Sequence, residues 1–334
     1  MSIIEFRDAD EILFEEEINV SLQDENTNLI IACFIGGFDS VRALLKREDV
    51  DVNQQNKRGW TALMAACNGG YLDIVKELLK RKDININFQT ENGDTALIMA
   101  CIQGHLDIVR ELLKREDVNV NLQDNDGHTA LMFSCMYWYL DIVQELLKRK
   151  DINVNLQDNV GQTALMFACN GGYLDIVKEL LKKKDINVNL QDMEGCTALM
   201  FTCNEWYFKI VKELLKRKDI NVNLQDNVGH TALMIACNAS SILSIFDLLK
   251  RKDININLRD MEGYTALMIA CSSRSSHIVR RLLEKKDIDI NLRNNIGQTA
   301  LMTACSKGCL NIIRELLKRE DIDVNIQYKM VTQP

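Results

Sequence analysis

Hydrophobic and polar positions follow one another along the chain in a pattern that returns every 34 residues. Within one period, residues 159–192, two apolar runs are separated by the pair Gly171-Gly172. The first run contains Leu165, Met166, Ala168 and Cys169, and the second contains Ile176, Val177, Leu180 and Leu181. Apolar residues three and four positions apart lie on one face of a helix. Each period therefore predicts two short amphipathic helices.

The residues around these two runs supply helix-boundary signals. Thr163 precedes the first run, and a threonine there can cap the free backbone N–H groups of a helix. The glycine pair ends that run, because glycine tolerates the left-handed conformation common at helix ends. Asp175 lies at the start of the second run and Lys182 at its end, as the helix dipole favours. The alternating stretch 186–190 and a turn ending at Gly195 predict an extended finger between one helix pair and the next.

The pattern recurs nine times, and we call each copy a repeat. The capping threonines are Thr27, Thr61, Thr95, Thr129, Thr163, Thr197, Thr231, Thr265 and Thr299. Two helices this short cannot bury their apolar faces alone, whereas stacked copies can. We therefore expect a stack over residues 22–327, with a charged cap at 1–21 and a short tail at 328–334. The expected repeats are 22–55, 56–89, 90–123, 124–157, 158–191, 192–225, 226–259, 260–293 and 294–327.

The motif D-x-x-G-x-T-A-L-M-x-A-C, followed by I-V-x-E-L-L and N-V-N, resembles the ankyrin repeat over about Leu22 to Gln327. The resemblance implies an all-α solenoid of helix-turn-helix repeats with projecting β-hairpin-like fingers. It also implies a curved stack in which the first helices and the fingers line a concave groove that recognises other proteins. One departure is that Thr-Ala-Leu-Met, as in Thr163 to Met166, replaces the family's Thr-Pro-Leu-His. This change removes a side chain that typically hydrogen-bonds between repeats.

Positions that vary between repeats while their surroundings stay the same are candidates for partner binding, because the scaffold does not dictate their residue type. The finger column, which is the position before each capping threonine, contains Trp60, Asp94, His128, Gln162, Cys196, His230, Tyr264 and Gln298. The resemblance implies that this column faces partners. A second variable set follows the first helices: Gln103, Tyr137, Trp138, Tyr139, Glu205, Trp206 and Tyr207.

Trp138 and Trp206 stand where other repeats have Gly70, Gly104 or Gly172. Exposed tryptophan and tyrosine are favoured as interface anchors. The alternative is that these rings fold back over a neighbouring repeat and fill space. Both interpretations stay open, and we expect repeats 4 to 6 to form the contact region.

Nine of the eleven cysteines share one repeat position: Cys33, Cys67, Cys101, Cys135, Cys169, Cys203, Cys237, Cys271 and Cys305. Free cysteine packs as a small hydrophobe. Stacked repeats hold equivalent Cα atoms roughly 10 Å apart, beyond the about 4.4–6.8 Å that a disulfide requires. Buried thiols in a reducing compartment are therefore expected, and packing is also the expected use of the first-helix phenylalanines Phe133, Phe167 and Phe201. Cys196 and His230 could share a metal ion only with further ligands.

Composition argues against several classes of function. The net charge of −8 disfavours nucleic-acid binding, which requires an excess of Lys and Arg on one face. The first residues, MSIIEFRDADE, carry acids where a secretion signal needs a basic region, and no apolar run is long enough to span a membrane. Basic helix ends such as Lys80-Arg81-Lys82 are typical of a solvated face. We therefore expect a cytoplasmic monomer, and the nucleus or a host cell is also compatible.

The sequence contains no phosphate-binding glycine loop and no nucleophile motif, and its four histidines form no metal-binding pair at helical spacing. We expect no enzyme activity, no catalytic residue, no cofactor and no bound metal. The expected function is protein–protein interaction through the groove and the finger tips. Two alternatives stay open. The array is the substrate-recruiting arm of a larger adaptor, such as a ubiquitin-ligase or effector protein, or its thiols sense metal or redox state.

Overall fold

The computed structural model describes residues 28–327 apart from residue 206. The cap expected at 1–21, Trp206 and the tail expected at 328–334 lie outside the described residues. The chain divides into two compact bodies, an N-terminal half that ends at Asn159 and a C-terminal half that begins at Val160. The described residues of both halves form paired short helices without a β-sheet, so the predicted all-α class is confirmed.

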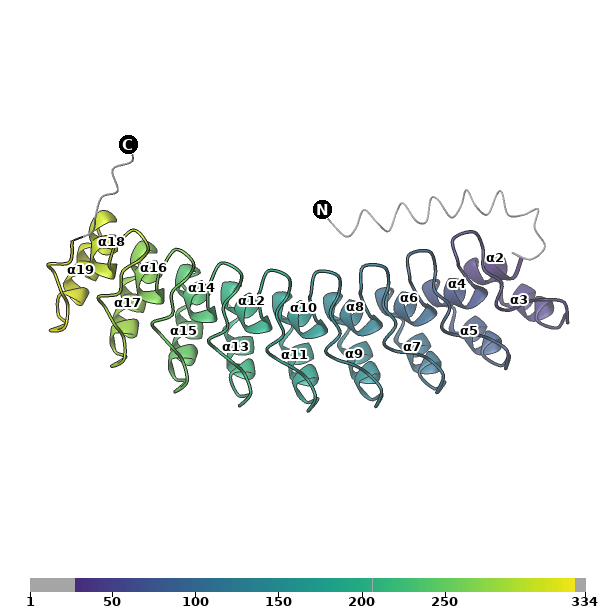
Figure 1. The fold of residues 1–334 in the computed structure, drawn as a ribbon. Coiled ribbons are helices and arrows are strands. Elements are labelled where there is room, and N and C mark those ends of the chain that lie inside the picture. The colour runs from purple at the N-terminus through teal and green to yellow at the C-terminus, as the bar shows by residue number, and fades with distance from the viewer. Residues whose placement is uncertain (1–27, 206, 328–334) are drawn as a thin grey trace, which may run out of the picture. The chain divides into compact units, whose positions relative to one another are not determined.

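The N-terminal half contains four helix pairs among its described residues. Their bounds are α2 (Asn28–Phe34), α3 (Phe38–Leu44), α4 (Ala62–Asn68), α5 (Leu72–Leu78), α6 (Ala96–Ile102), α7 (Leu106–Leu112), α8 (Ala130–Met136) and α9 (Leu140–Leu147). Each first helix contacts the next first helix, and each second helix contacts the next second helix. The pairs therefore stack in sequential order within this half (Figure 1).

The C-terminal half repeats this arrangement with five helix pairs. Their bounds are α10 (Ala164–Asn170), α11 (Leu174–Leu181), α12 (Ala198–Asn204), α13 (Phe208–Leu214), α14 (Ala232–Asn238), α15 (Ile242–Leu249), α16 (Ala266–Ser272), α17 (Ser276–Leu283), α18 (Ala300–Ser306) and α19 (Leu310–Leu316). Within this half the first helices again contact one another in order. The fingers project beyond them as the tall loops of Figure 1.

Threonine caps begin the first helices, as the sequence predicted. The Thr163 hydroxyl accepts a hydrogen bond from the Met166 N–H, at 3.2 Å. The Thr163 N–H in turn points at the Met166 sulfur, at 3.4 Å. Met166 is 1% exposed, so the methionine that replaces the family's histidine fills the core and closes the cap locally. The resemblance alone implied only the loss of a hydrogen bond between repeats.

The turn between the two helices of a pair requires a positive φ angle, which glycine adopts without strain. Gly172 has φ 73° and lies so close to the ring of Tyr207 that an added Cβ would come within 2.6 Å of it. Among the described residues, three repeats place another residue at the equivalent position: Trp138, Ser240 and Arg274 have φ 62°, 56° and 58°. For these residues the left-handed conformation costs energy.

Repeating apolar positions form the core. On α10 the side chains of Leu165 and Cys169 are 2% and 0% exposed, and on α11 Val177 and Leu180 are both fully buried. Eight of the nine cysteines of the shared position are buried, as expected for packing, but Cys305 is exposed. The prediction of burial was wrong for Cys305 because no following repeat covers α18 among the described residues.

Side-chain amides hold neighbouring fingers together. Gln191 donates from its amide to the carbonyl of Gly195 in its own finger at 2.6 Å, and to that of Gln225 in the next finger at 2.9 Å. Gln225 continues the series to Arg259. Each finger forms at most an isolated bridge, such as Gln191 with Thr197. The fingers are therefore tight turns fixed by side chains rather than parts of a sheet.

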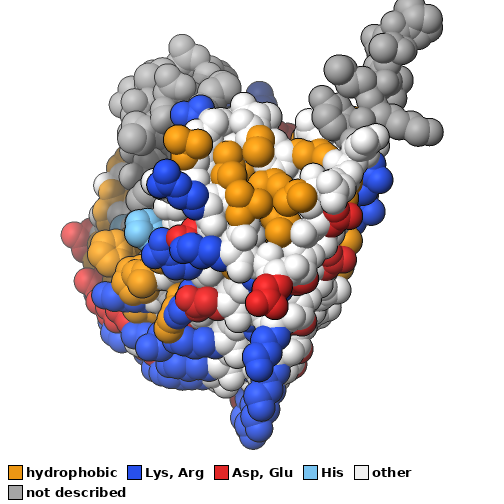
Figure 2. All heavy atoms as spheres, turned by 90° about the vertical axis from the view of Figure 1, so that its left-hand side faces the viewer, with side chains coloured by type: hydrophobic (Ala, Val, Ile, Leu, Met, Phe, Trp, Pro, Cys, Tyr) orange, Lys and Arg blue, Asp and Glu red, His pale blue; other side chains and the backbone are white. Residues whose placement is uncertain are grey.

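The α18–α19 end of the C-terminal half exposes apolar side chains. Val324 is 59% exposed, whereas its counterpart one repeat earlier, Ile290, is 2% exposed. Leu310 on α19 and Leu317, the residue that caps its C-terminus, are 66% and 51% exposed. Figure 2, seen from this end, shows hydrophobic side chains gathered on the face. These side chains are exposed because no further repeat packs against α18 and α19 within the described residues.

Candidate protein-binding groove

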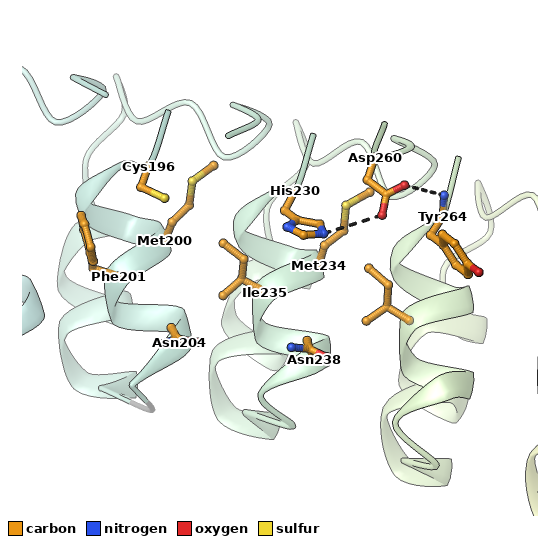
Figure 3. A pocket seen from close by; sticks show the side chains of 11 residues that line it. Cys196, Met200, Phe201, Asn204, His230, Met234, Ile235, Asn238, Asp260 and Tyr264 are labelled. Atoms are coloured by element: carbon orange, nitrogen blue, oxygen red, sulfur yellow. Dashed lines mark hydrogen bonds and ion pairs between the residues drawn. The ribbon is translucent and has the colours of Figure 1, made fainter. Parts of the chain in front are cut away.

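A cavity of about 510 Å³ lies on the finger side of α12, α14 and α16. Its lining, drawn in Figure 3, comprises Cys196, Met200, Phe201, Asn204, His230, Met234, Ile235, Asn238, Asp260, Tyr264 and Ile269. These side chains come from three consecutive first helices and from the fingers that precede them. We call this feature the groove.

The groove has an apolar floor between two polar edges. Phe201, Ile235 and Ile269 occupy one helical position on α12, α14 and α16, and all three are half-buried. Asn204 and Asn238 are exposed at the helix ends and form one edge. The finger column forms the other edge. Phe201 therefore contributes a face to the groove as well as packing, which differs from the use expected from the sequence.

Aspartates hold the finger column in place. The Asp260 carboxylate accepts a hydrogen bond from the Tyr264 N–H at 2.7 Å, and it lies 3.7 Å from Nε2 of His230 (Figure 3). The Asp226 carboxylate faces the other side of the same imidazole, at 3.5 Å from Nδ1. His230 thus bridges two fingers, and its side chain stays 40% exposed toward the groove.

Burial and nearby carboxylates, above all Asp192 and Asp226, raise the pKa of the Cys196 thiol to about 11. At neutral pH this group is a protonated thiol, and thiols are poor nucleophiles and poor metal ligands in that form. Cys196 therefore lines the groove as a neutral, half-buried side chain. Its N–H donates to Asp192 at 2.7 Å.

All eight residues of the finger column are half-buried. The structure brings Cys196, His230 and Tyr264 together in the groove, while Gln162 and Gln298 lie outside its lining. The remaining three belong to the N-terminal half: Trp60, Asp94 and His128. The column is thus divided between the two bodies.

Residues that follow the first helices have more varied surroundings. Gln103 donates from its amide to Oδ1 of Asn68 at 3.0 Å, which links two repeats. Tyr139 and Tyr207 lie against glycines of the preceding repeat, at Gly104 and Gly172. These two tyrosines fill space between repeats. Glu205 of the same set is exposed and accepts a hydrogen bond from the Asn204 side chain, and Trp206 lies outside the described residues.

An aromatic row crosses the α8 repeat of the N-terminal half. Ring centroids of His128 and Phe133 are 5.2 Å apart, those of Phe133 and Tyr137 are 6.3 Å apart, and those of Tyr137 and Tyr139 are 6.1 Å apart. Trp138 lies between Tyr137 and Tyr139 in the sequence and is 65% exposed. Its backbone is left-handed, with φ 62°. About two thirds of this side chain is therefore accessible to a partner.

One group in the described part of the chain brings together three side chains of the types that bind metals: the possible ligand atoms of Asp124, Asp126 and His128 lie within 4.8 Å of one another. One oxygen of Asp124 already accepts the N–H groups of Asp126 and His128, at 3.0 and 2.7 Å. The hydrogen bond to Asp124 raises the pKa of His128, and Asp158 lies 3.5 Å from the far ring nitrogen. These contacts show that the side chains of Asp124 and His128 hold the finger turn in shape. Histidine spacing along a helix does not indicate this cluster, because its three residues lie in a turn.

Comparison with known proteins identifies the class of molecule that the stacked helix pairs and fingers define. The family model of ankyrin repeats matches in overlapping segments from residue 6 to residue 328. The chain belongs to the ankyrin-repeat family, as the sequence resemblance indicated. No curated individual protein matches it. None of the described helices has the length and apolar character required to cross a membrane.

Proposed function

We propose that this protein is a non-catalytic scaffold that binds a partner protein through the groove of its C-terminal half. Ankyrin repeats generally mediate protein–protein interactions. The proposal rests on the difference between constant and variable positions in the groove. The core residues and the hydrogen bonds of the fingers recur from one repeat to the next. Cys196, His230 and Tyr264 occupy one repeat position, and their residue type differs. Variation on an otherwise constant scaffold is what a specific binding surface requires.

The groove favours a partner segment that presents apolar side chains to its floor and hydrogen-bonding groups to its edges. Phe201, Ile235 and Ile269 offer apolar area that the fold leaves half-exposed. The amides of Asn204 and Asn238 and the imidazole of His230 supply donors and acceptors around that floor. Protein interfaces commonly combine an apolar centre with a polar rim.

We propose a second contact surface in the N-terminal half, formed by Trp138 and the neighbouring Tyr137. Trp138 leaves 65% of its surface exposed at a strained backbone position, and this surface is available to a partner. Tryptophan and tyrosine are enriched among residues that dominate binding energy. The groove spans the repeats 192–225, 226–259 and 260–293, of which only the first belongs to the contact region expected from the sequence.

Site-directed photo-crosslinking tests the main proposal. A photoreactive residue at Asn238 faces the groove, and one at Lys212, exposed on the second helix α13, serves as the control. We expect a discrete protein to crosslink from Asn238 and not from Lys212. The substitutions Phe201→Thr and Ile235→Thr, which copy Thr303 of the last repeat, should abolish that crosslink while the chain stays folded.

A crosslink of equal yield from both positions would indicate nonspecific contact. A crosslink that survives the two threonine substitutions would exclude the apolar floor as the binding surface. The circular dichroism spectrum and the thermal midpoint of each variant distinguish loss of binding from loss of fold. These outcomes test the groove separately from the Trp138 surface.

The wider setting is also a proposal. Buried, protonated cysteines at the shared repeat position are consistent with a reducing compartment such as the cytoplasm. Burial raises the pKa of Cys101 and Cys203 to about 12, which disfavours the thiol-sensor alternative. The adaptor-arm alternative gives the same groove the task of recruiting a substrate, and the crosslinked protein would identify it.

A further inference from the structure

The finger tips of the C-terminal half carry apolar side chains that the groove does not use. Each finger ends in a β-turn closed by its glycine, as where the Gly195 N–H donates to the Asp192 carbonyl at 2.9 Å. We call the two residues inside each turn the tip. Five apolar tip residues are 51–70% exposed: Val160, Met193, Val228, Met261 and Ile296. The corresponding tips of the N-terminal half are polar: Lys57-Arg58, Glu91-Asn92 and Asn125-Asp126.

Backbone hydrogen bonds place these tips in a continuous line. The Met193 N–H donates to the Val160 carbonyl at 2.9 Å, and the Asn227 N–H donates to the Glu194 carbonyl at 2.9 Å. The Met261 N–H donates to the Val228 carbonyl at 3.0 Å. We call this line the tip ridge, and its order is Val160, Met193, Glu194, Asn227, Val228, Met261, Glu262, Asn295 and Ile296.

Apolar pairs alternate with polar pairs along the tip ridge. Val160 adjoins Met193, the pair Glu194 and Asn227 follows, and Val228 then adjoins Met261. The pattern therefore has a period of two repeats, because valine occupies the second tip position in one finger and methionine the first position in the next. A comparison of single repeats does not show this order.

The backbone of the ridge has little capacity to bind an added strand. The Glu194 N–H donates to its own turn at Asp192, at 3.0 Å. The Met193 carbonyl accepts the Asn227 side-chain amide at 2.7 Å, and the Val228 N–H donates to Asp226 at 3.0 Å. Addition of an extended peptide to a sheet edge depends on free backbone groups. A partner of the ridge must therefore contact its side chains.

We propose that the tip ridge pairs with the tip ridge of a second copy of this chain, in antiparallel orientation. The order of residues is self-complementary when one ridge is reversed about a point between Glu194 and Asn227. Val160 then faces the Met261 of the other copy, and Met193 faces its Val228. Each Glu194 faces an Asn227 amide, and no carboxylate faces another. Self-complementarity of this kind is what a two-fold symmetric interface requires.

The contact is small, so the association is weak and depends on concentration. A stable interface buries about 800 Å² on each partner, and four partly exposed apolar side chains supply less. The net charge of −8 adds repulsion between copies, so added salt strengthens the dimer. The dimer differs from the monomer expected from the sequence, and it does not depend on the groove or on its partner.

Sedimentation equilibrium from about 1 µM to about 1 mM protein tests the pairing. We expect a monomer–dimer equilibrium that Met193→Glu and Val228→Asp abolish. Both substitutions copy residues that the chain itself places at tips, Glu91 and Asp126, so the fold is retained. Asn227→Asp puts a carboxylate opposite Glu194 at two symmetric places and should weaken the dimer about tenfold. Adding Glu194→Lys to that variant should restore the dimer or tighten it.

The exposed end face provides the matched control. Leu310→Ser, which copies Ser276 of the preceding repeat, should leave the equilibrium unchanged. A monomer at every concentration overturns the proposal, and so does a dimer that survives Met193→Glu with Val228→Asp. Loss of the dimer in Leu310→Ser alone would transfer self-association to the end face. An unaltered dimer in Asn227→Asp would exclude the antiparallel pairing.

Discussion

Replacing Trp138 with glycine separates binding from packing at the residue for which the sequence left both interpretations open. Trp138 has φ 62° and is 65% exposed. Glycine stands at the equivalent position of other repeats, as at Gly104 and Gly172. Glycine rather than alanine is the informative substitution, because alanine would keep the backbone strain.

Three contributions set the expected change in stability. Relief of the left-handed conformation stabilises the fold by about 1–2 kcal/mol, and the greater freedom of glycine in the unfolded chain costs about 0.4–1 kcal/mol. A tryptophan presents about 250 Å². At 65% exposure it buries about 90 Å², and losing that area costs at most about 2 kcal/mol. The contributions partly cancel, so the free energy of unfolding should change by no more than about 2 kcal/mol in either direction.

Urea unfolding of the full chain, with hydrogen exchange of α8 and α9 as a local readout, measures this change. Ser240→Gly is the control, because Ser240 has φ 56° at the equivalent position without a large ring. A loss of about 3–5 kcal/mol, typical when a buried aromatic ring is removed, would refute the reasoning and favour packing. Unchanged stability together with weaker partner binding would support the role of Trp138 as a binding anchor.

Three further predictions concern the scaffold. Gly195→Ala should destabilise the chain by at least about 2 kcal/mol in urea unfolding, because φ is 77° and an added Cβ would meet the next finger's backbone at 2.8 Å. His128→Gln should cost more stability at about pH 5 than at about pH 9. Asp124 raises the folded pKa of His128, so its contribution is complete below the ordinary pKa and is lost as pH rises through the folded pKa. A larger cost at high pH would contradict that sign. In native thiol titration, Cys305 should react while Cys169 stays silent until unfolding; rapid reaction of Cys169 would show that the core opens.

The helix boundaries and the core could be predicted from the sequence because one local pattern is copied nine times. Thr163 as a cap and the end of α10 at Gly171 follow from local conformational preferences, and the structure confirms both. Cys169 and its equivalents had to pack because stacking brings the first helices together. Cys305 is exposed because the burial of this position requires a following repeat, and none packs against α18 among the described residues.

The parts of the site that the sequence did not predict depend on relations between repeats. The role of the Met166 sulfur in closing the helix cap requires side-chain geometry. The cluster around His128 forms because a turn folds Asp124 back on its own finger. Alignment at 34 residues marked Cys196 and Tyr264 as variable, but it could not show that they share a groove with Ile235.

Hydrogen exchange of the chain with and without its crosslinked partner tests the central claim most directly. If the groove is the binding surface, the partner should slow exchange in the fingers 192–197, 226–231 and 260–265, which bear its edge. Exchange in the second helices α13 and α15 should stay the same. Protection confined to those second helices, with unchanged fingers, would contradict the account.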